Sequence, residues 1–177
     1  MSTRSSGRRR TESTVATFLF LGLSLLGACL PAGTVDNLES RESLRGIRRL
    51  MVSVAMSEEA GQLGLSKESL RTDLQLKLRQ NGISVMEGEN ENLADCTLGV
   101  TITVIAPAQG GSPSGSLSLF VNEAVRLARD PSILVPARTG EVGGALDGSS
   151  GRSIRDTVGD LVNQFLNAWL SVNPKSR

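Results

Sequence analysis

The chain of 177 residues contains no histidine and no tyrosine. These absences exclude a Ser-His-Asp or Cys-His mechanism, a histidine-ligated metal site and a tyrosine nucleophile. A Ser-Lys mechanism is also disfavoured, because neither Lys67 nor Lys77 stands in a Ser-x-x-Lys motif. We therefore expect a protein that is not an enzyme, with no cofactor and no metal.

Other ligand motifs are also missing. Gly151-Arg152-Ser153 lacks the lysine of a phosphate loop, so residues 143–151 are interpreted as a flexible break. The net charge is only +1, and after residue 28 no block of like charge is large enough to suggest a nucleic acid partner. A cluster of carboxylates fits no calcium-ligand spacing and is interpreted as a solvated turn. Its members are Glu87, Glu89, Glu91 and Asp95.

The N-terminus has the order of an export signal. Arginines at positions 4, 8, 9 and 10 precede an uncharged apolar run over residues 15–28. This run is shorter than the ~20 residues that span a bilayer, and Pro31 follows it, which argues against an uncleaved anchor helix. A secretory signal cut near Ala28 or Ala32 and an organelle transit peptide remain alternatives. A twin-arginine signal is disfavoured, because Thr11-Glu12-Ser13 replaces the apolar pair.

The end of this run, Leu26-Gly27-Ala28-Cys29, resembles a lipobox. The resemblance implies cleavage before Cys29 and attachment of diacylglycerol to its sulfur, with a palmitate-containing membrane anchor. Leu30, not aspartate, follows the cysteine, and by the same resemblance we expect an outer-membrane lipoprotein that faces the periplasm. If Cys29 is not acylated, a disulfide to Cys96 is the alternative in an oxidising compartment. Cys96 itself is interpreted as a small buried hydrophobe.

Three segments follow from this interpretation. Residues 1–28 are the predicted lipoprotein signal peptide, and residues 29–45 carry the lipidated cysteine and a flexible tether. Residues 46–174 form the predicted α+β periplasmic domain. This domain is long enough to bury a hydrophobic core of its own.

Alternating and helical apolar patterns predict the elements of the domain. Strands are expected near residues 50–54, 97–105, 116–129 and 133–142, and helices after Ser66 and over residues 153–172. A loop is expected around Gly61 and Gly64, and the first helix is expected to stop at Gly82. We expect the apolar stripe of the last helix to pack on the apolar face of the strand over residues 97–105 and to bury Trp169. The residues of these two faces are Ile154, Val158, Phe165 and Trp169, and Leu98, Val100, Ile102 and Val104. The predicted fold is a two-layer sandwich, with a mostly antiparallel sheet of four to five strands and two helices on one face.

The strand over residues 116–129 is expected to point a row of side chains inward: Leu117, Leu119, Val121, Val125 and Leu127. Glu123 interrupts this row, which indicates either a binding pocket or a strand-edge or bulge position. Pro136 favours an edge position for the last strand.

One further set of residues carries a family resemblance. These are Gly64-Leu65-Ser66, Leu70, Asp73, Leu78-Arg79, Gly82-Ile83, Val85, Asp160, Phe165-Leu166-Asn167 and Asn173-Pro174. With them, residues 46–174 resemble uncharacterised exported bacterial lipoproteins. The element order is similar to LPS-assembly lipoproteins, ABC-transport auxiliary lipoproteins and the N-terminal domain of TolB. The resemblance implies an accessory role in the cell envelope.

We therefore expect a membrane-tethered accessory module that binds an envelope protein. A carrier of an apolar ligand or lipid, and a secreted or N-terminally anchored protein without lipidation, are the alternatives. A protein partner predicts an exposed apolar patch or an open sheet edge. A carrier predicts an enclosed pocket between sheet and helices.

Overall fold

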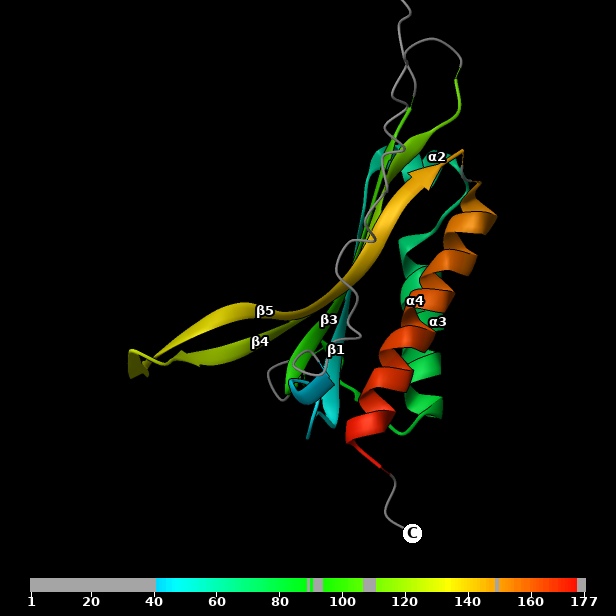
Figure 1. Cartoon of the computed structure of the whole chain (residues 1–177). Helices are drawn as coiled ribbons and strands as arrows, with labels where there is room; N and C mark the ends of the chain where they lie inside the picture. Colours follow the sequence, from blue (N-terminus) through cyan, green and yellow to red (C-terminus); the bar gives the residue numbers. More distant parts are fainter. Residues whose placement is uncertain (1–40, 89, 91–93, 107–110, 149, 175–177) are drawn as a thin grey trace, which may run out of the picture. The chain divides into compact units, whose positions relative to one another are not determined.

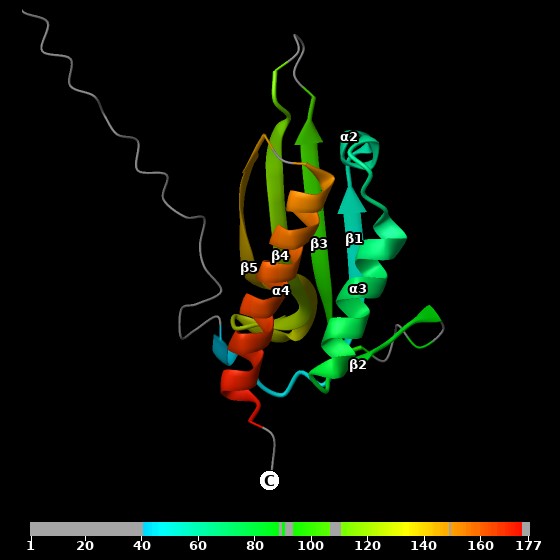
Figure 2. The ribbon, with the colours of Figure 1, turned by 90° about the vertical axis from the view of Figure 1, so that its right-hand side faces the viewer.

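A computed structural model describes residues 41–88, 90, 94–106, 111–148 and 150–174. They form a five-stranded sheet in the order β2-β1-β3-β4-β5, with helices packed on one face (Figures 1 and 2). The elements are β1 (Arg49–Met56), α2 (Glu58–Gln62), α3 (Lys67–Gln80), β2 (Ser84–Val85), β3 (Cys96–Ile105), β4 (Ser114–Leu127), β5 (Asp130–Asp147) and α4 (Gly151–Val172).

The α+β class agrees with the prediction, but the sheet is mixed. Strand β1 pairs in parallel with both β2 and β3, and only the β3-β4-β5 meander is antiparallel. The reason is that α3 carries the chain back to the end of the sheet at which β1 began. Both β2 and β3 therefore start at that end and run in the direction of β1. The described residues also contain a third helix, α2, where a loop around Gly61 and Gly64 was expected.

Helix α3 begins and ends where its sequence signals predict. The Ser66 hydroxyl accepts a hydrogen bond from the Ser69 N–H at 3.3 Å, and Gly82 adopts a left-handed φ of 91° after the last turn. Leu70, Leu74 and Leu78 form its buried stripe. Capping and apolar spacing therefore determine this helix locally.

The segment before α4 differs from the prediction. Residues 143–147 belong to β5 and pair with β4, so they are not a flexible break. A Cβ on Gly143 would lie 2.2 Å from the Leu117 carbonyl oxygen. Glycine is required there because two backbones approach closely, a cause that is not visible in the sequence. Helix α4 begins at Gly151, two residues earlier than predicted, and the Ser150 hydroxyl accepts from the Ser153 N–H at 3.2 Å.

The core lies between the sheet and the helix pair α3 and α4, which lie side by side across one face (Figure 2). The predicted α4 stripe is buried, and so is the predicted inward face of β3. These residues are Ile154, Val158, Phe165, Trp169, Leu98, Val100, Ile102 and Val104. Among the described helices, none is long and apolar enough to cross a membrane.

Candidate interaction site

Strands β4 and β5 continue past the rest of the sheet as a projecting hairpin. The last pair between β3 and β4 is Thr97–Asn122, and beyond it β4 pairs with β5 alone. We call residues 123–137 the arm and the remaining described residues the body. Figure 1 shows the arm leaving the sheet on the side opposite to α3 and α4. A register shift at Val121/Asn122 lies at this bend, as is typical of a β-bulge.

The arm corrects one prediction about the core. Leu117, Leu119 and Val121 are buried as expected, but Val125 and Leu127 are not. The alternation of side chains continues along β4, whereas the helix layer stops. The two side chains therefore point to the predicted face of the strand and find no helix there.

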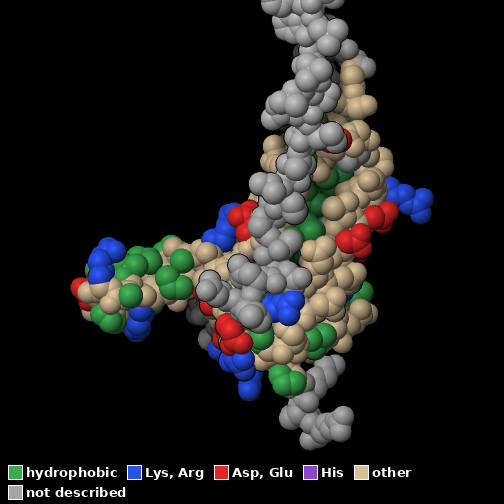
Figure 3. All heavy atoms as spheres, in the orientation of Figure 1, with side chains coloured by type: hydrophobic (Ala, Val, Ile, Leu, Met, Phe, Trp, Pro, Cys, Tyr) green, Lys and Arg blue, Asp and Glu red, His purple; other side chains and the backbone are tan. Residues whose placement is uncertain are grey.

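The composition of the arm is unusual for an exposed hairpin. Ten of its 15 residues are Ala, Val, Ile, Leu or Pro. Leu134 is 57 % exposed and Ile133 is 41 % exposed, and Figure 3 shows hydrophobic side chains gathered along the arm. Contiguous apolar surface of this kind marks an interaction site more often than isolated exposed leucines do.

The two faces of the arm differ in charge. Because strand side chains alternate, one face carries Glu123 at its base and Asp130, which pairs with Leu127, at its tip, with apolar residues between them. We call these apolar residues the apolar face: Val125, Leu127, Val135 and Ala137. The opposite face mixes Leu134 and Pro136 with Arg126.

Glu123 lies where the arm leaves the body. The Thr139 hydroxyl donates a hydrogen bond of 2.6 Å to Glu123 Oε1. Glu123 also lines a cavity of about 440 Å³, together with Cys96 and Leu134. The position beside a bulge agrees with one interpretation of the interrupted row. The other interpretation, a binding pocket, stays a prediction, because Glu123 only borders a hollow.

Cys96 is buried in the body, as predicted. Burial raises the pKa of its thiol to about 12, with a further contribution from the negative charges of Glu123 and Asp95. A raised pKa keeps the thiol protonated at neutral pH, and the protonated form is neither a good nucleophile nor a metal ligand. This cysteine is therefore a packing residue.

A second set of contacts fixes the root of the arm on the open face of the sheet. The Arg138 guanidinium lies 4.0 Å from the centre of the Phe120 ring and forms an ion pair of 2.9 Å with Glu141. The ring itself covers Gly99, where a Cβ would lie 2.2 Å from Phe120 Cζ. Sequence reasoning missed this stack, whose members come from three strands.

The acidic segment before β3 is structural where it is described. Asp95 accepts hydrogen bonds from the backbone N–H groups of Arg48 and Arg49, at 3.0 and 2.9 Å, and from the Arg49 side chain. Burial raises the pKa of Asp95, but these hydrogen bonds outweigh burial and leave the pKa below its ordinary value. Glu87 pairs with Arg79. Glu89 and Glu91 lie outside the described residues, and among the described ones no three metal-ligating side chains gather.

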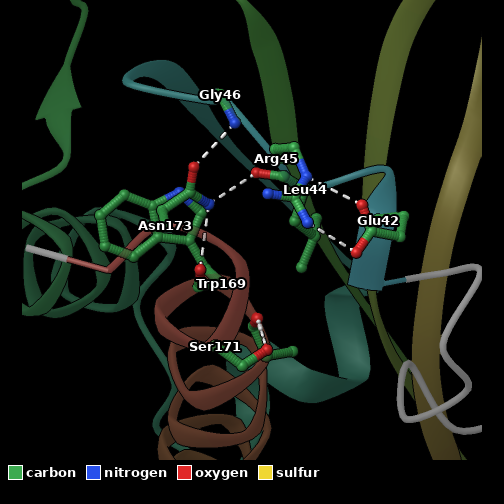
Figure 4. A network of polar contacts seen from close by, with 8 residues as sticks. Glu42, Leu44, Arg45, Gly46, Trp169, Ser171 and Asn173 are labelled. Atoms are coloured by element: carbon green, nitrogen blue, oxygen red, sulfur yellow. Dashed lines mark hydrogen bonds and ion pairs between the residues drawn. The ribbon is translucent and has the colours of Figure 1, made fainter.

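The chain enters the body at the C-terminal end of α4 (Figure 4). Trp169 Nε1 donates to the Ile47 carbonyl at 2.9 Å, and Asn173 Nδ2 donates to the Leu44 carbonyl at 2.8 Å. The Gly46 N–H returns a bond of 2.7 Å to Asn173 Oδ1. Leu44 is fully buried, although it falls in the stretch expected as tether. Cys29, the predicted lipid attachment site, lies outside the described residues.

No protein-family model and no curated protein matches the chain. Among solved structures, it is similar to a variant of the PelC dodecamer from Paraburkholderia phytofirmans, with 17 % identity, a TM-score of 0.40, and coverage of 71 % of this chain and 89 % of that one. It is also similar to the hypothetical protein CT253 from Chlamydia trachomatis, with 9 % identity, a TM-score of 0.42, and coverage of 70 % and 97 %. These values are too low to assign a family or a function.

Proposed function

We propose that the chain is a lipid-anchored accessory protein of the bacterial envelope, and that it binds a protein partner through its arm. The observation that carries the proposal is the apolar hairpin that projects beyond the helix layer. The lipobox-like sequence at Cys29 supplies the anchor, and Leu30 favours the outer membrane. The module acts by binding and not by catalysis.

The arm and the filled core favour binding of a protein partner over carriage of an apolar ligand. The space between sheet and helices is filled by fully buried side chains, among them Phe165, Leu119 and Ile102. Cavities lie at the root of the arm and, with about 320 Å³, between α3 and α4, where Lys77 Nζ donates to the Gly159 carbonyl. A carrier would instead need room inside the core.

The anchor is tested with Cys29→Ser in the producing bacterium. We expect the variant to lose incorporation of a labelled fatty acid and to leave the membrane fraction, because a thioether link requires the cysteine sulfur. Cys96→Ser is the matched control and should keep both properties. An unlabelled parent chain that stays in the membrane fraction would contradict lipidation and support an N-terminal anchor helix.

The same cells also test whether the protein is sorted to the inner or the outer membrane. Separation of inner and outer membranes on a density gradient should place the parent chain with outer-membrane markers. Leu30→Asp should move it toward the inner membrane, since the expected sorting signal resides at that position. A parent chain found with inner-membrane markers would contradict the outer-membrane assignment.

A further inference from the structure

The cavity of about 440 Å³ at the base of the arm has a lining of mixed chemistry, and we call it the root cavity. Its walls are residues 94–97 at the start of β3, residues 122–124 of β4 beside the bulge, and residues 134–136 of β5. The volume falls within the range of ligand pockets in proteins. The charges and the apolar surface of the lining therefore determine what can fill it.

The root cavity is negatively charged. Asp95 and Glu123 are the charged residues of its lining. Asp95 already has a cation beside it, since the Arg49 guanidinium lies 2.8 Å from its carboxylate. The half-buried Glu123 accepts a hydrogen bond from the Thr139 hydroxyl, but it forms no ion pair with another described residue. Withdrawing a carboxylate from water without a cation costs free energy, so this lining favours a cationic occupant.

Neutral hydrogen-bonding groups complete the polar part of the lining. The side chains of Thr97 and Asn122 are half-buried, and neither forms a hydrogen bond with another described residue. No three metal-ligating side chains gather in the part of the chain that the structure describes, which disfavours a metal ion here. A guanidinium group carries several N–H donors in one plane and can use a carboxylate together with neutral oxygens.

The remaining wall of the root cavity is apolar and belongs to the arm. Ala124, Leu134 and Pro136 are exposed, and the Leu134 residue is 57 % exposed. An arginine side chain packs its methylene stem on apolar surface and keeps its charged end among polar groups. An apolar wall with a carboxylate at its base therefore matches the two parts of this side chain.

We propose that the root cavity binds an arginine side chain of the protein that docks on the arm. The inference deepens the proposed function and rests on it, because it names the chemical group by which the partner is recognised. The methylene stem lies along Leu134, and the guanidinium pairs with Glu123. The carboxylate that interrupts the apolar row of β4 thus supplies specificity at one end of an otherwise apolar contact.

NMR spectroscopy of the isotope-labelled full chain tests the root cavity with a small probe, N-acetyl-arginine amide. The probe should shift the backbone amide signals of Cys96, Thr97 and Glu123, with a dissociation constant of about 1–10 mM, as expected for so small a ligand. N-acetyl-citrulline amide has a similar shape without the positive charge and should bind about tenfold more weakly. Shifts that do not saturate, or equal binding of the two probes, would overturn the proposal.

A lysine probe separates the planar guanidinium from a point charge. N-acetyl-lysine amide should bind more weakly than the arginine probe, because an ammonium group cannot reach several acceptors in one plane. Tighter binding of the lysine probe would overturn the assignment to arginine.

Glu123→Gln tests the carboxylate itself. The variant removes the charge and keeps both the side-chain length and an oxygen for the Thr139 hydroxyl, so arginine affinity should fall about tenfold, to that of citrulline. Glu58→Gln on α2 makes the same change outside the root cavity and should bind the probes as the parent chain does. A purely structural Glu123 would change thermal stability and leave the preference for arginine over citrulline intact. That result would overturn the proposal.

The inference and the proposed function can fail separately. An envelope protein that binds the arm equally well after Glu123→Gln would overturn the root cavity as its recognition site, while the proposed function stands. If no protein binds the arm but the root cavity still prefers arginine to citrulline, the proposed partner fails and the guanidinium site stands.

Discussion

The body and the arm share two long strands, β4 and β5, yet the apolar side chains of these strands have different surroundings in the two regions. In the body, β4 points Leu117 and Leu119 at α4, and both are buried. In the arm, the same row reaches Val125 and Leu127, which lie beyond the helices. The comparison shows that an alternating pattern specifies a face of a strand but not what covers it.

Substitutions in the two regions should differ in how much they lower the free energy of unfolding. Removing a buried aromatic ring costs several kcal/mol of unfolding free energy, because the burial of its apolar atoms is lost and a cavity remains. Changes at exposed positions cost little. Substitutions of buried residues in the body should therefore lower the free energy of unfolding. Substitutions in the arm should change association only.

The largest effect is expected for Trp169→Ala, at about 3–5 kcal/mol of unfolding free energy. The ring is buried, and its Nε1–H bonds to the Ile47 carbonyl at 2.9 Å, which would be left without this donor. Urea denaturation followed by circular dichroism measures the loss, because the substitution removes the only tryptophan. Trp169→Phe keeps most of the packing and should lose less. A loss below ~1 kcal/mol for the alanine variant would contradict the observed packing.

An intermediate effect is expected for Gly143, the first of two adjacent glycines in β5. Gly143→Ala places a Cβ 2.2 Å from the Leu117 carbonyl oxygen, so the strands must shift. We expect a loss of about 1–3 kcal/mol, as for other overpacked sites. Gly144→Ala is the matched control, because its Cβ would meet nothing within 4 Å. Equal denaturation midpoints for the two variants would mean that the segment is not held tightly against β4.

The smallest effect on stability is expected in the arm. Leu134→Ser should change the unfolding free energy by less than ~0.5 kcal/mol, because the side chain is already largely exposed. Thermal denaturation of the two chains measures this difference. A loss above ~1 kcal/mol would show that the arm belongs to the cooperative core of the body, and the distinction between the two regions would fail.

The candidate site was only partly predictable. Cys29 stays a prediction from a local motif, because it lies outside the described residues. Glu123 stood out in the sequence because it interrupts a row of apolar residues. The arm itself was not predicted, because nothing in residues 123–137 indicates that β3 begins opposite Asn122 and leaves the rest of β4 without this neighbour. The stack of Phe120, Gly99 and Arg138 was missed for a similar reason, because its members are neighbours only across strands.

The sequence by itself determined the elements whose signals are local. Ser66, Gly82 and the spacing of three leucines define α3, and the apolar stripe of α4 correctly predicts a buried Trp169. Only the tertiary structure decided the parallel position of β1, the close contact at Gly143 and the projection of the arm. Periodicity records which side of an element is apolar, whereas strand order and the extent of the covering layer depend on contacts between residues far apart in the chain.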